Sequence, residues 1–318
     1  MIYTKRVCEV YVPLAAFSIF MVVSSAVFFM RAPVVFVTDV YFSAVYGERY
    51  EKVRRLEASL RILNQIKIVR IMGETDNVSI NMAITAASKK PSAVFFLSAY
   101  EEAALFYAKQ IKESTDGFTK VYVILDRNGT PKTSSDVYYV AYDTDIDCYR
   151  AGQCAAILAL DSEAPSIDES KPKSIILIHD STVKLTAKDT FIEGLHDGGF
   201  NERVDFIGNY DNRNWDNAVA IVFYSSSASY IQAGADTPAI IFSWFTNLNY
   251  MPDNIKISVD DSPFYVIPLV LKRAAKKKLS EHSLIVLPSE FIIFDSRIKN
   301  KNTVKKLKEI VVYQGITP

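Results

Sequence analysis

The chain is poor in the residues on which most catalytic and metal sites depend. Its 318 residues include only three histidines, three cysteines and 11 glycines. Scattered histidines make a zinc site or a Ser-His-Asp triad hard to build, and no GxxxxGK[ST], GxSxG or HExxH pattern occurs. The 36 basic residues equal the 36 acidic residues in number, so no overall field favours nucleic acid. We therefore expect no enzyme, no cofactor, no metal site and no nucleic-acid partner.

The cysteines do not predict a disulfide or a redox motif. Cys148 and Cys154 lie six positions apart in one helical pattern, which places them on different faces and too far apart to bridge. Cys8 precedes an apolar run instead of following it, so it does not indicate lipid attachment. We interpret Cys148 and Cys154 as small packing residues.

The N-terminal region contains a long apolar run. No charged residue occurs in Val10–Met30, and Lys5 and Arg6 precede it. The run is long enough to span a bilayer as an uncleaved anchor, and Ser24 and Ala26 are alternatively the small residues of a signal-peptide cleavage site. Both interpretations send the globular part across a membrane, because positive charge favours the cytoplasmic side.

Short β-branched apolar runs alternate with longer amphipathic stretches in the first half of the chain. Near-continuous apolar character is typical of parallel strands covered on both faces, and predicts strands at Val34–Val37, Ile66–Ile71, Ala93–Leu97, Val121–Leu125 and Tyr138–Ala141. Helical spacing predicts helices at Val53, Leu56, Leu60 and Leu63, and again at Tyr100, Ala104, Tyr107 and Ile111. A weaker helical pattern covers Asp76–Ala87.

The alternation starts again in the second half. Strands are predicted at Ser174–Ile178, Asp205–Ile207, Ala220–Phe223, Ala239–Phe242 and Lys256–Val259, and helices at Ile146–Leu160, Ala187–Leu195 and Ser262–Leu279. Between Ile207 and Ala220 the chain has barely enough residues for a crossover helix, so we expect that helix to be short or missing. A late strand at Phe291–Phe294 and a helix at Thr303–Val311 are expected to recross the hinge and pack back.

Two similar halves predict an α/β fold of two Rossmann-like lobes, with parallel sheets joined by a hinge and preceded by an N-terminal apolar helix. The expected division is a signal peptide or membrane anchor at 1–31, an N-terminal lobe at 32–144, a C-terminal lobe at 145–288, and a hinge-recrossing strand with a terminal helix at 289–318.

Polar and aromatic side chains recur directly after the predicted strands. Ligands of open parallel sheets bind beyond the carboxyl ends of the strands, and carboxylates with aromatic rings suit a small polar ligand that has apolar faces. An alternative is that an Asp or Ser at such a position only caps the following helix. The candidate ligand-binding residues are Asp39, Phe42, Ser98, Asp126, Asp143, Asp180, Tyr224, Trp244 and Asp260.

Three stretches carry a resemblance to a known family. Val140–Leu158 is similar to the hinge strand, aspartate, Ala-Gly and helix of type 1 periplasmic-binding proteins, and Thr190–Leu195 is similar to their helix in which two residues separate an aromatic residue from Gly-Leu. Thr237–Phe242, which follows Ala233–Asp236, is the third. The resemblance covers roughly Pro33–Ser296. It implies two lobes that close on a solute, as in sugar and nucleoside receptors and in the effector domains of lactose-repressor-type regulators.

One branch of the family gives a more specific comparison. Thr38–Ser43 loosely resembles the opening motif of nucleoside-binding basic membrane lipoproteins, and Asp126 matches their ligand-binding aspartate. The resemblance implies that Phe42 stacks on a base and that Asp126 engages it. Ser243-Trp244 stands where the family usually carries an aspartate, which leaves open a remodelled or lost pocket.

We therefore expect an extracytoplasmic solute-binding protein that presents a nucleoside or sugar to an ABC permease, either in the periplasm or anchored to the cytoplasmic membrane by the N-terminal helix. The alternative is a membrane-anchored sensor or interaction protein with the same fold and a remodelled or lost ligand site. In that case another membrane protein is the partner.

Overall fold

The computed structural model describes residues 28–73, 75–114, 119–127, 129–161, 170–179, 187–208, 217–224, 237–242, 251–276 and 284–313, together with residues 15, 18 and 26. Within these residues no helix is both long and apolar enough to cross a membrane. The expected N-terminal helix, Val10–Met30, falls almost entirely outside them.

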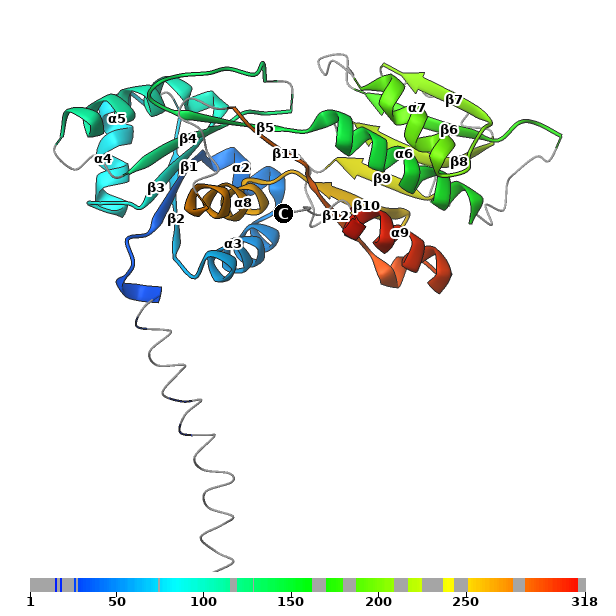
Figure 1. The fold of residues 1–318 in the computed structure, drawn as a ribbon, viewed down its shortest axis with the longest axis horizontal. Helices are drawn as coiled ribbons and strands as arrows, with labels where there is room; N and C mark the ends of the chain where they lie inside the picture. The colour runs from blue at the N-terminus through cyan, green and yellow to red at the C-terminus, as the bar shows by residue number, and fades with distance from the viewer. Residues whose placement is uncertain are drawn as a thin grey trace, which may run out of the picture.

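The chain forms two α/β lobes that lie side by side (Figure 1). The first lobe contains a six-stranded parallel sheet in the order β11-β5-β4-β3-β1-β2. Its strands are β1 Val34–Asp39, β2 Ile66–Ile71, β3 Ala93–Leu97, β4 Lys120–Ile124, β5 Tyr138–Tyr142 and β11 Ile285–Leu287. Helices cover both faces of this sheet: α2 Val40–Tyr46, α3 Glu48–Ile62, α4 Asn77–Ala87, α5 Glu101–Glu113 and α8 Pro263–Ala275.

The second lobe repeats this plan with one antiparallel edge strand. Its sheet has the order β12-β10-β9-β8-β6-β7, and β12 runs antiparallel to β10. The strands are β6 Ser174–His179, β7 Arg203–Ile207, β8 Ala218–Tyr224, β9 Ala239–Phe242, β10 Ile255–Asp260 and β12 Glu290–Ile293. The helices are α6 Thr144–Leu160, α7 Lys188–Asp197 and α9 Lys301–Tyr313.

The near-continuous apolar runs correctly predicted the central strands. Every residue of β3 and of β8 is buried, as expected for parallel strands covered on both faces. Two short elements, α2 and β11, were not predicted, because seven and three residues are too few to show a period. The region expected to hold a short or missing crossover helix before β8 includes residues 209–216, which lie outside the described residues.

The chain crosses between the lobes three times, after β5, after β10 and between β11 and β12. The second crossing, after β10, places α8 and β11 in the first lobe, since α8 packs on α3 and β11 pairs with β5, and the third crossing returns the chain to the second lobe. The expected division assigned 145–288 to the second lobe, and the arrangement of the strands differs from it after residue 262. Ile285 and Leu287 are buried where β11 pairs with the first sheet, whereas β12, which begins three residues after β11 ends, pairs with the second sheet.

Close backbone contact joins α6 to α7. A Cβ on Gly152 would lie 2.3 Å from the carbonyl oxygen of Phe191, and a Cβ on Gly194 would lie 2.0 Å from that of Tyr149. The two glycines belong to the two stretches that resemble the family, and each lets the other helix approach. Cys148 and Cys154 are buried and free in this helix, which confirms their role as packing residues.

Candidate site between the lobes

The carboxyl ends of β1, β3 and β4 form one side of the candidate site. Asp39, Ser98 and Asp126 follow these adjacent strands, so the structure brings the three predicted residues to one edge of the first sheet. Asp39 caps α2, its Oδ1 accepting from the Phe42 amide at 2.6 Å. Burial and the charge of Asp39 raise the pKa of Tyr100, which adds Tyr100 to this first-lobe wall, defined here as Thr38, Asp39, Ser98, Tyr100 and Asp126.

Two oxygen atoms of the first-lobe wall are buried without a partner. The Oδ1 of Asp126 and the Oγ1 of Thr38 lack a hydrogen-bond partner among the residues that the structure describes. A buried polar atom without a partner costs about 1–3 kcal/mol, and such atoms are uncommon in native structures. These two acceptors are therefore the parts of the wall best suited to a ligand that donates hydrogen bonds.

Phe42 does not line this wall. It is 2% exposed, and its ring stacks on Tyr46 at a centroid distance of 5.4 Å. Phe36 and Phe264 contact the same ring. The seven-residue helix α2 directs the side chain inward, so Phe42 fills the core instead of presenting a face to a ligand as the resemblance implied.

The most heavily bonded residue between the lobes is Arg127, which directly follows Asp126. Its Nη1 contacts Asp147 of α6 at 3.0 Å, its Nε contacts Asp261 at 2.9 Å, and its Nη2 donates to the hydroxyl of Ser289 at 2.7 Å. Both carboxylates are fully buried. These four residues, the hinge arginine cluster, tie the first lobe to α6 and to two of the three crossings.

Aromatic rings surround the same guanidinium. Its carbon lies 4.7 Å from the ring centroid of Phe242, 5.2 Å from that of Tyr142 and 5.9 Å from that of Tyr224. These rings stand at the carboxyl ends of β9, β5 and β8. The strand ends of both sheets therefore meet at Arg127, and the predicted ligand residue Tyr224 is covered by an arginine of the chain itself.

Burial and charge determine the protonation of the hinge arginine cluster. Burial alone would lower the pKa of the Arg127 guanidinium, but the charges of Asp261 and Asp147 outweigh burial and hold that pKa above its ordinary value. Burial raises the pKa of Asp261 to about 6, against the opposing charge of Arg127. Burial also raises the pKa of Tyr224 to about 12, so its hydroxyl stays protonated at neutral pH.

A second ion network fixes Asp260. Its carboxylate is fully buried and contacts the Nη2 of Arg54, on α3, at 2.7 Å. Arg54 also pairs with Glu290 at the third crossing, and the Tyr46 hydroxyl lies 3.3 Å from Asp260. Asp260 was predicted to contact ligand, but in this structure it forms a buried ion pair with Arg54 beside the second crossing.

The remaining predicted residues divide into two groups. Asp143 caps α6, accepting from the Ile146 amide at 3.2 Å, as the alternative of helix capping anticipated. Asp180 and Trp244 lie outside the described residues. Arg127, Asp147 and Asp261 were missed as a site because their partners are 20 and 134 positions apart; the only signal was an arginine placed directly after a buried strand.

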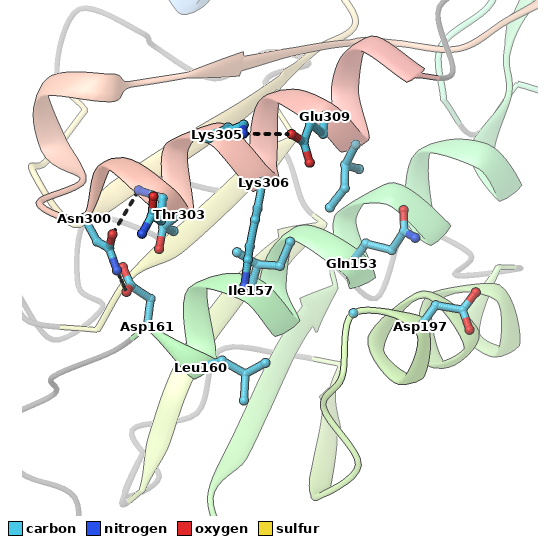
Figure 2. A pocket seen from close by; sticks show the side chains of 13 residues that line it. Gln153, Ile157, Leu160, Asp161, Asp197, Asn300, Thr303, Lys305, Lys306 and Glu309 are labelled. Carbon is cyan, nitrogen blue, oxygen red and sulfur yellow. Dashed lines mark hydrogen bonds and ion pairs between the residues drawn. The ribbon is translucent and has the colours of Figure 1, made fainter.

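A separate hollow of about 1080 Å³ lies on the second lobe, between α6, α7 and α9 (Figure 2). Figure 2 shows Lys306 reaching from α9 across this hollow toward Ile157 on α6. Its rim mixes charges of both signs, with Asp161, Lys305 and Glu309 among the lining residues. No group of three or more His, Cys, Asp or Glu in the described part of the chain could hold a metal ion.

Comparison with known proteins identifies the fold. No family model matches the sequence, and no curated protein matches it. The chain is similar to an ABC transporter solute-binding protein from Conexibacter woesei, with a TM-score of 0.54, 13% identity and coverage of 91% of this chain and 99% of that chain. It is also similar to ABC transporter solute-binding proteins from Aeropyrum pernix, with a TM-score of 0.50, 13% identity and coverage of 89% and 86%.

These likenesses establish the type 1 periplasmic-binding-protein fold, as the three sequence stretches predicted. In this chain the fold consists of two lobes with mainly parallel sheets and three crossings between them.

Proposed function

We propose that this protein is an extracytoplasmic solute-binding protein, which holds a small polar ligand between its lobes and presents it to an ABC permease. The observation that carries the proposal is the pair of buried oxygen atoms that have no hydrogen-bond partner among the described residues, Asp126 Oδ1 beside Arg127 and Thr38 Oγ1 near the end of β1. No catalytic step and no cofactor is part of the proposal.

The chemistry of the first-lobe wall favours a ligand rich in hydroxyl or amine donors. Asp126 and Thr38 offer buried oxygen acceptors, while Tyr100 offers a ring at the same edge. A carboxylate accepts strong hydrogen bonds from hydroxyl and N–H groups, and aromatic rings pack on the apolar face of a sugar or a base. A sugar or a nucleoside combines both properties, and these two classes are the proposed ligands.

The N-terminal sequence supports an extracytoplasmic location of the two lobes. The uncharged run Val10–Met30 follows Lys5 and Arg6, and this order favours export of the globular part. We include in the proposal that the run remains as a membrane anchor, with Arg31–Pro33 as the whole linker to β1. The protein then works at the outer face of the cytoplasmic membrane.

The hinge arginine cluster favours the second candidate function, a membrane-anchored sensor or interaction protein. Arg127 joins the lobes through two buried ion pairs and covers Tyr224. A solute-binding protein must open and close about its crossings, and bonds of this kind oppose opening. In the sensor, the partner is a membrane protein that recognises the fixed arrangement of the lobes.

A ligand screen separates these candidates. The purified full chain is heated with single sugars and nucleosides, because a ligand that binds only the folded state at about 100 times its Kd adds roughly 2.7 kcal/mol to the stability. We expect at least one sugar or nucleoside to raise the Tm. Absence of a shift across both classes contradicts the transport proposal and leaves the sensor.

The Asp126→Ala variant then tests the site. It removes the carboxylate whose Oδ1 has no hydrogen-bond partner among the described residues, and it is expected to abolish the shift that the wild type shows. The matched control is Asp189→Ala, which removes an exposed aspartate in the first turn of α7 and should retain the shift. Retention of the full shift in Asp126→Ala contradicts the assignment of the ligand to this wall.

A further inference from the structure

Three large apolar side chains of α3, and a fourth at its C-cap residue Leu63, lie on the outside of the lobe. Val53, Leu56, Leu60 and Leu63 are 57%, 60%, 57% and 61% exposed, at spacings of three, four and three residues. The sequence predicted the helix correctly from these four residues, but such a stripe ordinarily faces the core. Together they form the α3 stripe, a continuous apolar surface of the kind that marks an interaction site.

The contacts on the inner face of α3 explain why the apolar stripe faces outward. Arg54 points inward to the buried carboxylate of Asp260, and Glu51 is 1% exposed and pairs with Arg70. These ion pairs tie α3 to the hinge and to the edge strand β2. The inner face combines these ion pairs with the small buried residues Ala58 and Ser59. The four apolar side chains of the α3 stripe lie on the outer face and are more than half exposed.

The N-terminal segment enters the lobe beside the end of the α3 stripe. The Nη1 of Arg31 donates to the carbonyl oxygen of Leu63 at 3.3 Å, and the Asn64 side chain donates to the carbonyl oxygen of Ala32 at 2.8 Å. Figure 1 shows α3 on the same side of the first lobe as Phe28–Met30. Phe29 and Met30 are 71% and 85% exposed, so exposed apolar side chains directly precede the arginine that is bonded to Leu63.

The linker is too short to hold the lobe away from a membrane. Three residues, Arg31–Pro33, separate the apolar run from β1, and three extended residues span about 10 Å. The α3 stripe extends from Leu63 over ten residues, or roughly 15 Å of helix. A bilayer that holds Val10–Met30 therefore lies within reach of the stripe.

The charges beside the stripe complete the match to a lipid surface. Arg49 is exposed on the first turn of α3 and Arg55 is half-buried six residues further on, and neither has an ion pair among the described residues. Lys52 is also exposed, but it pairs with Glu48 at 2.6 Å. Helices that lie in the headgroup region combine apolar side chains with flanking Lys and Arg, and each basic residue near an anionic surface adds to the attraction.

We propose that the α3 stripe docks the first lobe on the surface of the same bilayer that holds the N-terminal segment. The inference rests on the anchor in the proposed function. Docking fixes the orientation of the first lobe and leaves the second lobe to move about the three crossings. The outer face of α3 then becomes a membrane contact of a protein whose ligand site is elsewhere.

The test measures lipid contact at the stripe in the full chain. Cys8 is replaced by Ser, and the buried Cys148 and Cys154 are retained. Leu60→Cys is labelled with an environment-sensitive fluorophore, and the protein is reconstituted in phosphatidylcholine–phosphatidylglycerol vesicles that carry nitroxide lipids. The matched control is Leu160→Cys, which labels a leucine of the second lobe with 65% exposure.

We expect loss of emission by nitroxide quenching at residue 60 and none at residue 160, in protein that floats with the vesicles. Flotation without quenching at residue 60 overturns the docking but leaves the anchor intact. Failure to float overturns both. A blue-shifted emission at residue 60 that nitroxide lipid does not quench, and whose shift disappears when the protein is diluted, shows that a second copy of the chain covers the stripe. This result also overturns the proposal.

Discussion

Replacement of Arg127 by Met is expected to destabilise the protein severely. The variant keeps an apolar stem against Phe242 but leaves the carboxylates of Asp147 and Asp261 buried without their counter-charge. Removal of one partner from a buried ion pair costs about 3–5 kcal/mol. Asp261, whose pKa is already about 6, can take up a proton when Arg127 is removed, and this limits its contribution to the destabilisation. We therefore expect the free energy of unfolding to fall by about 3–5 kcal/mol in total.

The assay is urea denaturation at neutral pH, followed by circular dichroism. Arg203→Met is the matched control, because Arg203 pairs with Asp205 at 2.8 Å but is 64% exposed, and exposed pairs contribute under about 1 kcal/mol. Adding Asp147→Asn and Asp261→Asn to Arg127→Met should restore part of the loss, since buried amides need no counter-charge. A loss below about 1 kcal/mol, or no recovery with the amides, refutes the account of the hinge arginine cluster.

Three further predictions follow from packing and burial. Gly194→Ala should lower the Tm markedly, because backbone contact at 2.0 Å outweighs the gain of about 1 kcal/mol in helix propensity. Gly208→Ala should leave the Tm nearly unchanged, because the nearest atom to its Cβ among the described residues is the Cε1 of His179 at 3.4 Å. Burial raises the pKa of Asp261 from 3.8 to about 6, so the folded state retains a proton that the unfolded state loses. The contribution of Asp261 to the free energy of unfolding should therefore fall as pH rises from about 4 to about 6, by at most about 1.4 kcal/mol per pH unit, and Asp261→Asn should remove that slope from pH-dependent denaturation curves. Burial raises the pKa of Cys148 and Cys154 to about 12, so neither should react with a thiol reagent until the protein unfolds; reaction at the folded-state rate of an exposed thiol would contradict their burial.

The sequence predicted the strands well because burial on both faces gives them an uninterrupted apolar pattern. The strands β3, β4 and β8 coincide, to within two residues at each end, with the apolar runs that predicted them. The glycines of α6 and α7 lie where the two helices contact each other. Membership of a lobe was harder to predict. Ile285–Leu287 follows the second series in the chain but pairs with β5, and three residues carry no information about their partner strand.

The candidate site was predictable only in part, because strand-end residues have three distinct uses that look alike in sequence. Asp126 retains a free buried oxygen, Asp143 caps a helix, and Asp260 holds an arginine. The partner that decides each use comes from a distant segment, as Arg54 does for Asp260. For the same reason the helical period of α3 was evident, whereas the direction of its apolar face was not.

Hydrogen–deuterium exchange with a ligand from the screen tests the central claim most directly. If the ligand lies between the lobes, exchange should slow together at the ends of β1 and β4 in the first lobe and at the ends of β8 and β9 in the second. Protection confined to one lobe, or to the hollow between α6 and α9 (Figure 2), would contradict a ligand site formed by both sheets.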